Sequence, residues 1–385
     1  MKKSYLAAAA ILGAAVFAGQ AHAVKIDLGE GKSFNMGFRA KIHGTYMGKR
    51  DDNDKADLAL SVPNSRIYAK GSISKIFKWG WQGDFAGSIK DNDGDTIGFG
   101  VFKIVDAFIM LDFAKEAKVY AGFIKLPFEL HSGIQSGWSF IMPTGPNYGL
   151  ANQPFTNPAA DGERAAGSGS RAAQLGVWGK VADGMFKYYL YLVDARDEDS
   201  TNEAKTGYGV RVEFAPTMAG YKGHPGYVLK ETYLGKQNTL TVGLAYFTEK
   251  TGGNNNKSLG IDALWEQNFG AVTPNINVGY VKHENFRGVD GRDRSGWIVQ
   301  GQLLFNQDTI LGKPAIGVRW AQSNKDDDAP VTFEKSSVIG VTGQLYVKGV
   351  GNRIALSIDR VKDDNQSAPN KDSWTDVTLA FWYNF

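Results

Sequence analysis

The sequence has 385 residues, no cysteine and a formal net charge of +3 at neutral pH, with 43% hydrophobic and 12% aromatic side chains. Without cysteine, the chain cannot be a disulfide-stabilised scaffold, bind a metal through thiolates or attach c-type haem. The nearly balanced charge gives no reason to expect a nucleic-acid partner, and we expect no cofactor.

The first 23 residues have the pattern of a secretory signal peptide. They begin M-K-K-S-Y, continue through the apolar stretch from Leu6 to Gly19, and end in A-H-A at Ala23. We therefore expect export, with the mature chain starting at Val24. Beyond these residues no run reaches about 18 apolar residues, the length that a membrane helix needs. The remaining choices are a soluble periplasmic protein and a β-barrel, and the 47 glycines and the aromatic content favour the barrel.

Apolar and polar residues alternate in many short segments after residue 33. A period of two predicts strands that have one lipid-facing side and one polar side. We count sixteen such segments, an even number that suits a bacterial barrel with an aqueous channel. They are residues 34–43, 64–73, 78–90, 101–113, 118–126, 172–181, 185–194, 206–215, 239–249, 258–267, 273–283, 295–305, 314–322, 337–348, 352–361 and 373–385.

The connections between these segments alternate between long and short, as outer loops and periplasmic turns do in such barrels. The third outer connection, from Pro127 to Arg171, has about 45 residues, and loops of this length are usually functional or disordered. We expect it to fold inward and narrow the pore. The connection from Ala215 to Asn238 departs from the alternation, because it is long where a turn is expected.

The last strand, Ser373 to Phe385, ends in an aromatic residue and resembles the closing strand of a bacterial outer-membrane barrel. The predicted fold is therefore all-β: a transmembrane antiparallel β-barrel of about 16 strands over residues 24–385. A soluble β-sandwich or propeller is the alternative, but its strands would bury one face in a core. A closed barrel is the only sheet that satisfies its backbone in lipid.

Two segments beside the third loop resemble one porin family. The first is G-F-I-K-L-P-F-E, from Gly122 to Glu129, and the second is R-A-A-Q-L-G-V-W-G-K, from Arg171 to Lys180, followed by K-Y-Y-L from Lys187. Their pattern is similar to that of the phosphate-selective porin O/P family. The resemblance implies a homotrimeric outer-membrane channel for anions.

The parity of the strands predicts a basic stripe on the water-filled side. Arginine and lysine in a narrow pore favour anions, and arginine suits phosphate oxygens. Asp84, Asp106, Asp112, Glu213, Asp262 and Asp359 share these faces, so a mixed wall without preference is the alternative. The candidate pore-lining and anion-binding residues are Arg39, Lys41, His43, Arg66, Lys70, Lys125, Lys180, Arg211, Arg319 and Arg353. Lys125 could equally lie in the lumen or extend to the membrane rim.

These patterns predict a passive porin for small anionic or neutral solutes, surrounded by outer-membrane lipid, and not an enzyme. One alternative is a barrel that encloses a periplasmic electron carrier or displays its loops as a binding surface. Another is a hydrolase that uses His131 and Ser132, although no motif supports it. Asp91 to Asp95 resembles the start of a calcium loop but lacks the closing glutamate, so we expect no metal site.

Overall fold

The computed structural model describes most of the chain. The predicted signal peptide, apart from Ala23, and the Asp91–Asp95 segment lie outside the described residues. No helix in the described part is long and apolar enough to cross a membrane. The described residues are 23–49, 57–90, 96–143, 155, 158–159, 171–194, 206–251, 254–325, 335–363 and 372–385.

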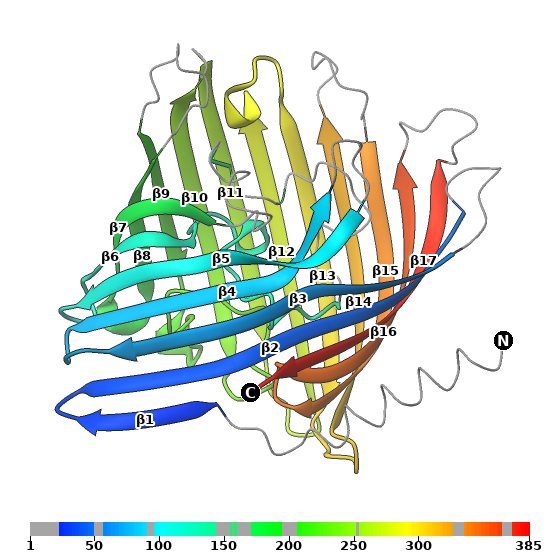
Figure 1. The fold of residues 1–385 in the computed structure, drawn as a ribbon, viewed down its shortest axis with the longest axis horizontal. Coiled ribbons are helices and arrows are strands. Elements are labelled where there is room, and N and C mark those ends of the chain that lie inside the picture. Colours follow the sequence, from blue (N-terminus) through cyan, green and yellow to red (C-terminus); the bar gives the residue numbers. More distant parts are fainter. Residues whose placement is uncertain are drawn as a thin grey trace.

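Sixteen antiparallel strands close into a barrel, as predicted (Figure 1). Each strand from β2 onward pairs with the next, and β17 pairs with β2 from Val377 opposite Tyr46 to Asn384 opposite Arg39. The strands are β2 (Lys32–Met47), β3 (Asp57–Ser72), β4 (Phe77–Lys90), β5 (Thr96–Asp112), β6 (Lys118–Lys125), β7 (Arg171–Val181), β8 (Phe186–Val193), β9 (Gly207–Phe214), β10 (Thr239–Thr251), β11 (Asn254–Glu266), β12 (Val272–Glu284), β13 (Arg294–Phe305), β14 (Lys313–Lys325), β15 (Lys335–Lys348), β16 (Asn352–Asp363) and β17 (Ser373–Asn384).

The seam of the barrel, where β17 meets β2, also contains a short strand that the alternation of apolar and polar residues did not predict. Strand β1 (Val24–Gly29) forms a hairpin with β2, in which Val24 lies opposite Met36. Strand β3 occupies one edge of β2. Strands β1 and β17 therefore share the other edge of β2. The terminal residue Phe385 exchanges two backbone hydrogen bonds of 3.0 Å with Phe38, between the two strands. The aromatic terminus therefore completes the barrel seam.

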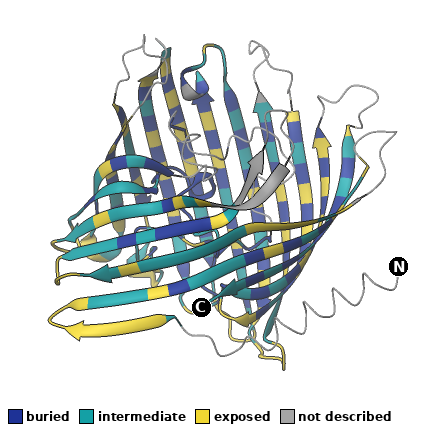
Figure 2. Cartoon of the chain, viewed as in Figure 1, coloured by how far each residue is buried: buried dark blue, intermediate teal, exposed yellow. Residues whose placement is uncertain are grey.

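The two faces of each strand differ as the sequence predicts. In β10, Leu244 points outward and is 53% exposed, whereas Ala245 and Phe247 point inward and are buried. Figure 2 shows the same alternation of buried and exposed residues along most strands. An exposed apolar face around a closed sheet is the surface that lipid requires.

Short connections gather at one end of the barrel, for example residues 73–76, 113–117 and 349–351. Among the described residues, four short 3-10 turns lie in connections: η1 (Leu130–Ser132), η3 (Ala182–Gly184), η4 (Thr217–Ala219) and η5 (Phe286–Gly288). The exception at residues 215–238 is confirmed, since this connection between β9 and β10 is long although it begins and ends at the short-turn end. We call residues 215–238 the inner segment and residues 126–170, between β6 and β7, loop L3.

A hydrophobic core lies inside the barrel, where a wide-open pore would have water. Loop L3 contributes residues such as Phe128 and Leu130, and the inner segment contributes Tyr227 and Leu229. The Tyr227 ring packs edge-on at 4.9 Å from the ring of Tyr120 on the wall. Burial of a large apolar side chain stabilises by about 1.5–3 kcal/mol, so both insertions are held firmly. The prediction that L3 folds inward is confirmed.

Candidate functional site

Loop L3 begins with a buried carboxylate that organises its first turn. Glu129 Oε2 accepts hydrogen bonds from the backbone N–H groups of His131, at 2.8 Å, and Ser132, at 2.9 Å. Its other oxygen lies 2.7 Å from His131 Nδ1. Across the lumen, His131 Nε2 lies 2.8 Å from Asn277 Oδ1 on β12. Both ring nitrogens therefore face acceptors, which is the arrangement of a protonated imidazole.

Two wall glycines make room for this turn. A Cβ on Gly279 would lie 2.4 Å from Glu129 Oε1 and 2.5 Å from His131 Nδ1, and one on Gly260 would lie 2.7 Å from Glu129 Cβ. These distances are shorter than real side chains tolerate. The inward faces of β11 and β12 thus form a slot that only glycine permits, and the first turn of L3 fills it.

A buried arginine fastens the same turn to the barrel wall. Arg211 on β9 donates to both carboxylate oxygens of Asp262, at 2.5 and 2.8 Å, and to the backbone oxygen of Phe128, at 2.8 Å. Asp262 in turn accepts the Leu130 N–H at 3.0 Å. Because neither charge is exposed, the pair is a structural anchor whose partners must remain together.

The later part of L3 reaches the opposite wall near the seam. Lys41 on β2 donates to the backbone oxygen of Gly137 at 2.6 Å, and Gln344 on β15 donates to that of Ile141. Trp138 packs edge-on against Trp382 of β17 at 6.1 Å. Loop L3 therefore crosses the lumen from β11 and β12 to β15, β17 and β2.

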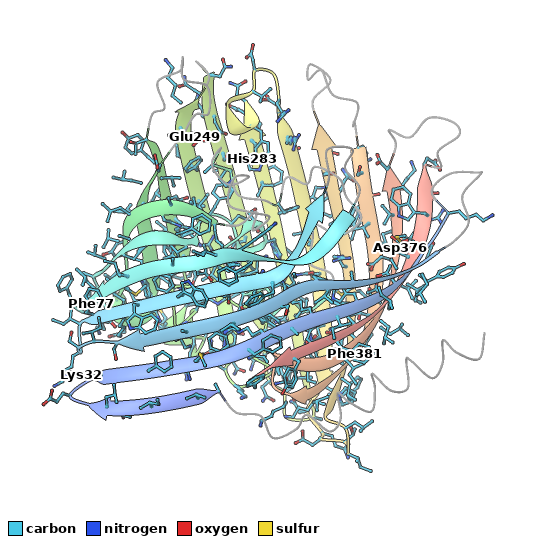
Figure 3. The ribbon with its side chains drawn as sticks, in the orientation of Figure 1. Lys32, Phe77, Glu249, His283, Asp376 and Phe381 are labelled. Carbon is cyan, nitrogen blue, oxygen red and sulfur yellow. The ribbon has the colours of Figure 1, made fainter. Side chains whose placement is uncertain are left out.

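The far end of L3 has a further anchor near the upper end of the barrel. Asn256 donates at 2.7 Å both to the Pro158 backbone oxygen and to Glu249. Glu249 and His283 are both labelled in this part of the barrel in Figure 3. The His283 ring lies 6.0 Å from the ring of Phe128, which belongs to the start of L3. The described parts of the loop are thus fixed to the wall at several heights.

Cations gather where L3 faces β2 to β5. Arg39, Lys41 and Arg66 point inward from β2 and β3, and Lys125 donates to the Gly133 backbone oxygen of L3 at 2.7 Å. Lys125 therefore lies in the lumen and not at the membrane rim. Electrostatic interactions connect Lys125 with Arg171, Arg66 and Lys41.

Two carboxylates pair with arginines in this group of cations. Arg66 pairs with Asp84 at 2.5 Å, and Arg171 pairs with Asp106 at 2.7 Å. Arg39 instead lies 4.2 Å over the ring of Tyr68. We define the basic cluster as Arg39, Lys41, Arg66, Lys70, Lys125, Arg171 and Lys230. In the described part of the chain, this cluster therefore places seven cations beside the carboxylates of Asp84 and Asp106.

Water reaches part of this cluster. Lys70 and Lys230 are exposed, and Arg39, Arg66 and Lys125 are partly exposed, although all lie on the inner side of the barrel. Lys230 comes from the inner segment and lies within electrostatic reach of Lys70. By contrast, the inward residues of β10 to β13 are mostly buried. The accessible side of the lumen is therefore the basic side.

The remaining predicted site residues lie elsewhere. His43 and Arg353 are buried next to Lys41, and Arg353 stacks at 3.4 Å over Trp382. Lys180 lies opposite Lys187 near the short turn at residues 182–184. Arg211 and Arg319 are fully buried, and Arg319 pairs with Asp359 at 2.7 Å. Burial and pairing keep these two arginines from direct contact with a solute.

The candidate hydrolase pair takes part in the loop anchor. The Ser132 hydroxyl donates to Glu129 at 2.9 Å, and the ring of His131 contacts Glu129 and Asn277. The two side chains are thus directed to the carboxylate and not to each other. Within the described ranges, no group of three or more His, Asp or Glu residues is arranged to hold a metal ion.

Comparison with known proteins now identifies the family. A profile of the family described as phosphate-selective porin O and P matches residues 34–267, more than half of the chain. The chain belongs to this family. The family and the closed barrel locate this porin O/P protein in the bacterial outer membrane.

Individual relatives are more distant. An uncharacterized protein of Aquifex aeolicus (strain VF5) is 27% identical over 238 residues, which are 54% of each chain, so this chain spans about half the length of that relative. Pseudomonas putida OprB is 11% identical with a TM-score of 0.61, over 93% of this chain and 95% of that one. The anion-selective porin of Comamonas acidovorans is 14% identical with a TM-score of 0.57, over 92% and 100%. At these identities, the solved structures support the fold alone.

Several residues of this porin O/P site were not found from the sequence. Lys230 and Glu231 lie in the inner segment, whose unexpected length was the only signal. Glu129 caps the short turn η1, but the usual N-cap residues are serine, threonine, aspartate and asparagine, so its role gave no clear signal in the sequence. The pairing of Arg171 with Asp106 depends on the neighbouring strands β5 to β7, which a single sequence does not specify.

Proposed function

We propose that this protein is a passive outer-membrane porin whose water-filled channel prefers small anions over cations. The observation that carries the proposal is the basic cluster, which includes the accessible inward side chains beside L3. Charged groups that line a narrow, low-dielectric passage set ion preference, and arginine and lysine favour anions. The preference is weak, because Asp84 and Asp106 neutralise part of the positive charge.

The solute class is small anions in general, with neutral solutes also admitted. Phosphate specificity would be supported by a row of arginines along the loop, but the described stretch 126–143 of L3 contains no lysine or arginine. Arg164 lies outside the described residues. Phosphate is therefore one candidate among the oxyanions that an arginine fork can bind.

The reversal potential across a salt gradient tests the sign of this preference. Purified protein is inserted into a planar bilayer that separates concentrated from dilute potassium chloride. We expect a reversal potential of the sign set by chloride permeation. A potential of the opposite sign would overturn the anion preference. Titration with millimolar phosphate then distinguishes a phosphate-binding channel, which is blocked, from a general anion channel.

We also propose that the protein is a homotrimer, as the family resemblance implies. The chain has a mass of 41.9 kDa, so an intact trimer should have about three times the mass of the mature chain. Light scattering in mild detergent, with the detergent contribution subtracted, measures this mass. A monodisperse monomer that still conducts would contradict the trimer and leave the channel proposal intact.

A further inference from the structure

The inner segment is the connection that the predicted alternation of long outer loops and short turns does not explain. It leaves β9 and rejoins β10 at the end of the barrel with the short turns, yet it extends into the lumen. The wall holds it at several points: Lys187 donates to the Gly226 backbone oxygen at 2.6 Å, and Tyr189 donates to that of Tyr227 at 2.7 Å. Glu266 accepts the Tyr233 N–H at 3.0 Å. A segment fixed in this way can support another element.

Loop L3 contacts the inner segment directly through the backbone. The Ser136 N–H donates to the Leu229 oxygen at 2.8 Å, and the Leu229 N–H donates to the Ile134 oxygen at 3.3 Å. Gln135 and Leu229 thus form a parallel bridge. The Tyr227 hydroxyl adds a 2.7 Å hydrogen bond to the Lys125 backbone oxygen at the start of L3. Two connections from opposite ends of the barrel therefore meet inside it.

Glu231 joins three elements at this meeting point. Its Oε2 accepts the Ile141 N–H of L3 at 2.9 Å and the Gln300 side chain of β13 at 2.9 Å. Its backbone N–H donates to Ser139 Oγ of L3 at 3.2 Å. The residue is only 1% exposed, so it does not line the water-filled path. A deeply buried carboxylate is costly unless it is hydrogen-bonded; here Oε2 has one donor on L3 and one on β13, whereas Oε1 has no hydrogen-bond partner among the described residues.

We propose that the inner segment positions loop L3, and that Glu231 is the positioning residue through which a connection from the periplasmic end sets the open width of the channel. This inference rests on the proposed channel function. Only some of the contacts of loop L3 are made to the barrel wall. The inner segment supports the loop in the middle of the lumen. Ile141 donates its backbone N–H to Glu231 and accepts a hydrogen bond from Gln344 of β15, so Glu231 holds L3 where the loop reaches that strand.

Two substitutions of Glu231 distinguish its role in positioning L3 from an effect of its charge. Glu231→Ala removes the oxygen that accepts both hydrogen bonds. Glu231→Gln keeps an amide oxygen that can accept both, removes the charge and puts an NH2 group in place of Oε1. Open-channel current noise and single-channel conductance are recorded for each variant, after heat-modifiable gel mobility has shown that the barrel is folded. Glu116→Ala, in an exposed turn outside the lumen, is the matched control.

We expect Glu231→Ala to raise the current noise by about twofold or more, because L3 loses hydrogen bonds that restrict its motion. Glu231→Gln and Glu116→Ala should match the wild type. If Glu231→Ala matches the wild type, or if both Glu231 variants change equally, the positioning role is overturned. A wild-type protein that never conducts would instead contradict the channel function itself.

Ser139→Ala keeps the test decisive if Glu231→Ala does not fold. This substitution removes the L3 hydroxyl that accepts the Glu231 N–H and leaves every strand of the wall unchanged. The expected result is again higher current noise with a folded barrel. Noise equal to that of the wild type would count against the inference.

Discussion

Individual inward-facing cations differ in how completely their charge is neutralised. Arg211 and Arg319 are buried against Asp262 and Asp359 and stabilise the wall. Lys70 is exposed inside the barrel and has Arg39 and Lys230 as its electrostatic neighbours, both of them cations. Ion preference should therefore depend on residues of the second kind.

Reversal of the charge at Lys70 should weaken the anion preference. A glutamate there would lower the positive potential beside Arg39 and Lys230, so the ratio of chloride to potassium permeability should fall by about twofold or more. Reversal potentials of Lys70→Glu and wild-type channels measure this change. Lys115→Glu, in an exposed turn outside the lumen, is the control and should leave the ratio unchanged. Equal ratios for Lys70→Glu and the wild type would remove Lys70 from the selective path.

The anchor of L3 should depend on pH through His131. Burial lowers the pKa of His131, but the Glu129 carboxylate and its hydrogen bond raise that pKa more, to about 9. Since the ordinary value is 6.5, the protonated ring stabilises the folded loop fully below that pH. The stabilisation is lost as the pH rises through about 9.

Open-channel noise recorded at neutral pH and at about pH 10 tests this dependence. The noise of the wild type should rise at the higher pH as L3 loosens. His131→Gln cannot titrate, so its noise should be nearly the same at both values. An equal rise in the wild type and the variant would show that another group is responsible.

At the scale of single elements, the position of L3 depends on the shape of the wall as well as on its hydrogen bonds. Gly279→Ala should displace the first turn of L3, because the added Cβ overlaps Glu129 and His131. Overpacking of this kind costs about 1–3 kcal/mol. Thermal unfolding and single-channel conductance should both change. Gly343→Ala on β15, where a Cβ has open space, is the control; an unchanged Gly279→Ala channel would contradict the slot.

The same element shows how far sequence reasoning extends. The strands were predictable because alternation is a local property, and the inward fold of L3 was predictable from its length. Its anchors were not, since Gly279, Arg211 and Glu231 lie far from L3 in the sequence. The inner segment was recognised only as a misfit. Likewise, parity indicated that Arg319 points inward but could not show that Asp359 neutralises it.

For the whole molecule, closure of the seam links the last residue to the first strand of the barrel. Deletion of Phe385 removes two backbone hydrogen bonds to Phe38 and the contact with the Tyr68 hydroxyl, together with an aromatic side chain that packs on Phe38 at 5.8 Å. We expect a smaller fraction of folded barrel, measured by heat-modifiable gel mobility of the refolded protein. Phe385→Tyr keeps the ring and the backbone and should fold as the wild type does. Equal folding of the deletion variant would contradict this role of the terminus.

The molecule as a whole combines a lipid-facing barrel with two insertions that fill part of its lumen and leave the basic cluster on the accessible side. We infer that this partly filled lumen still conducts ions. Purified protein added to a planar bilayer at neutral pH measures it most directly. We expect stable, discrete steps of conductance, each from one inserted channel or oligomer. A folded protein that inserts into the bilayer and never conducts would contradict it.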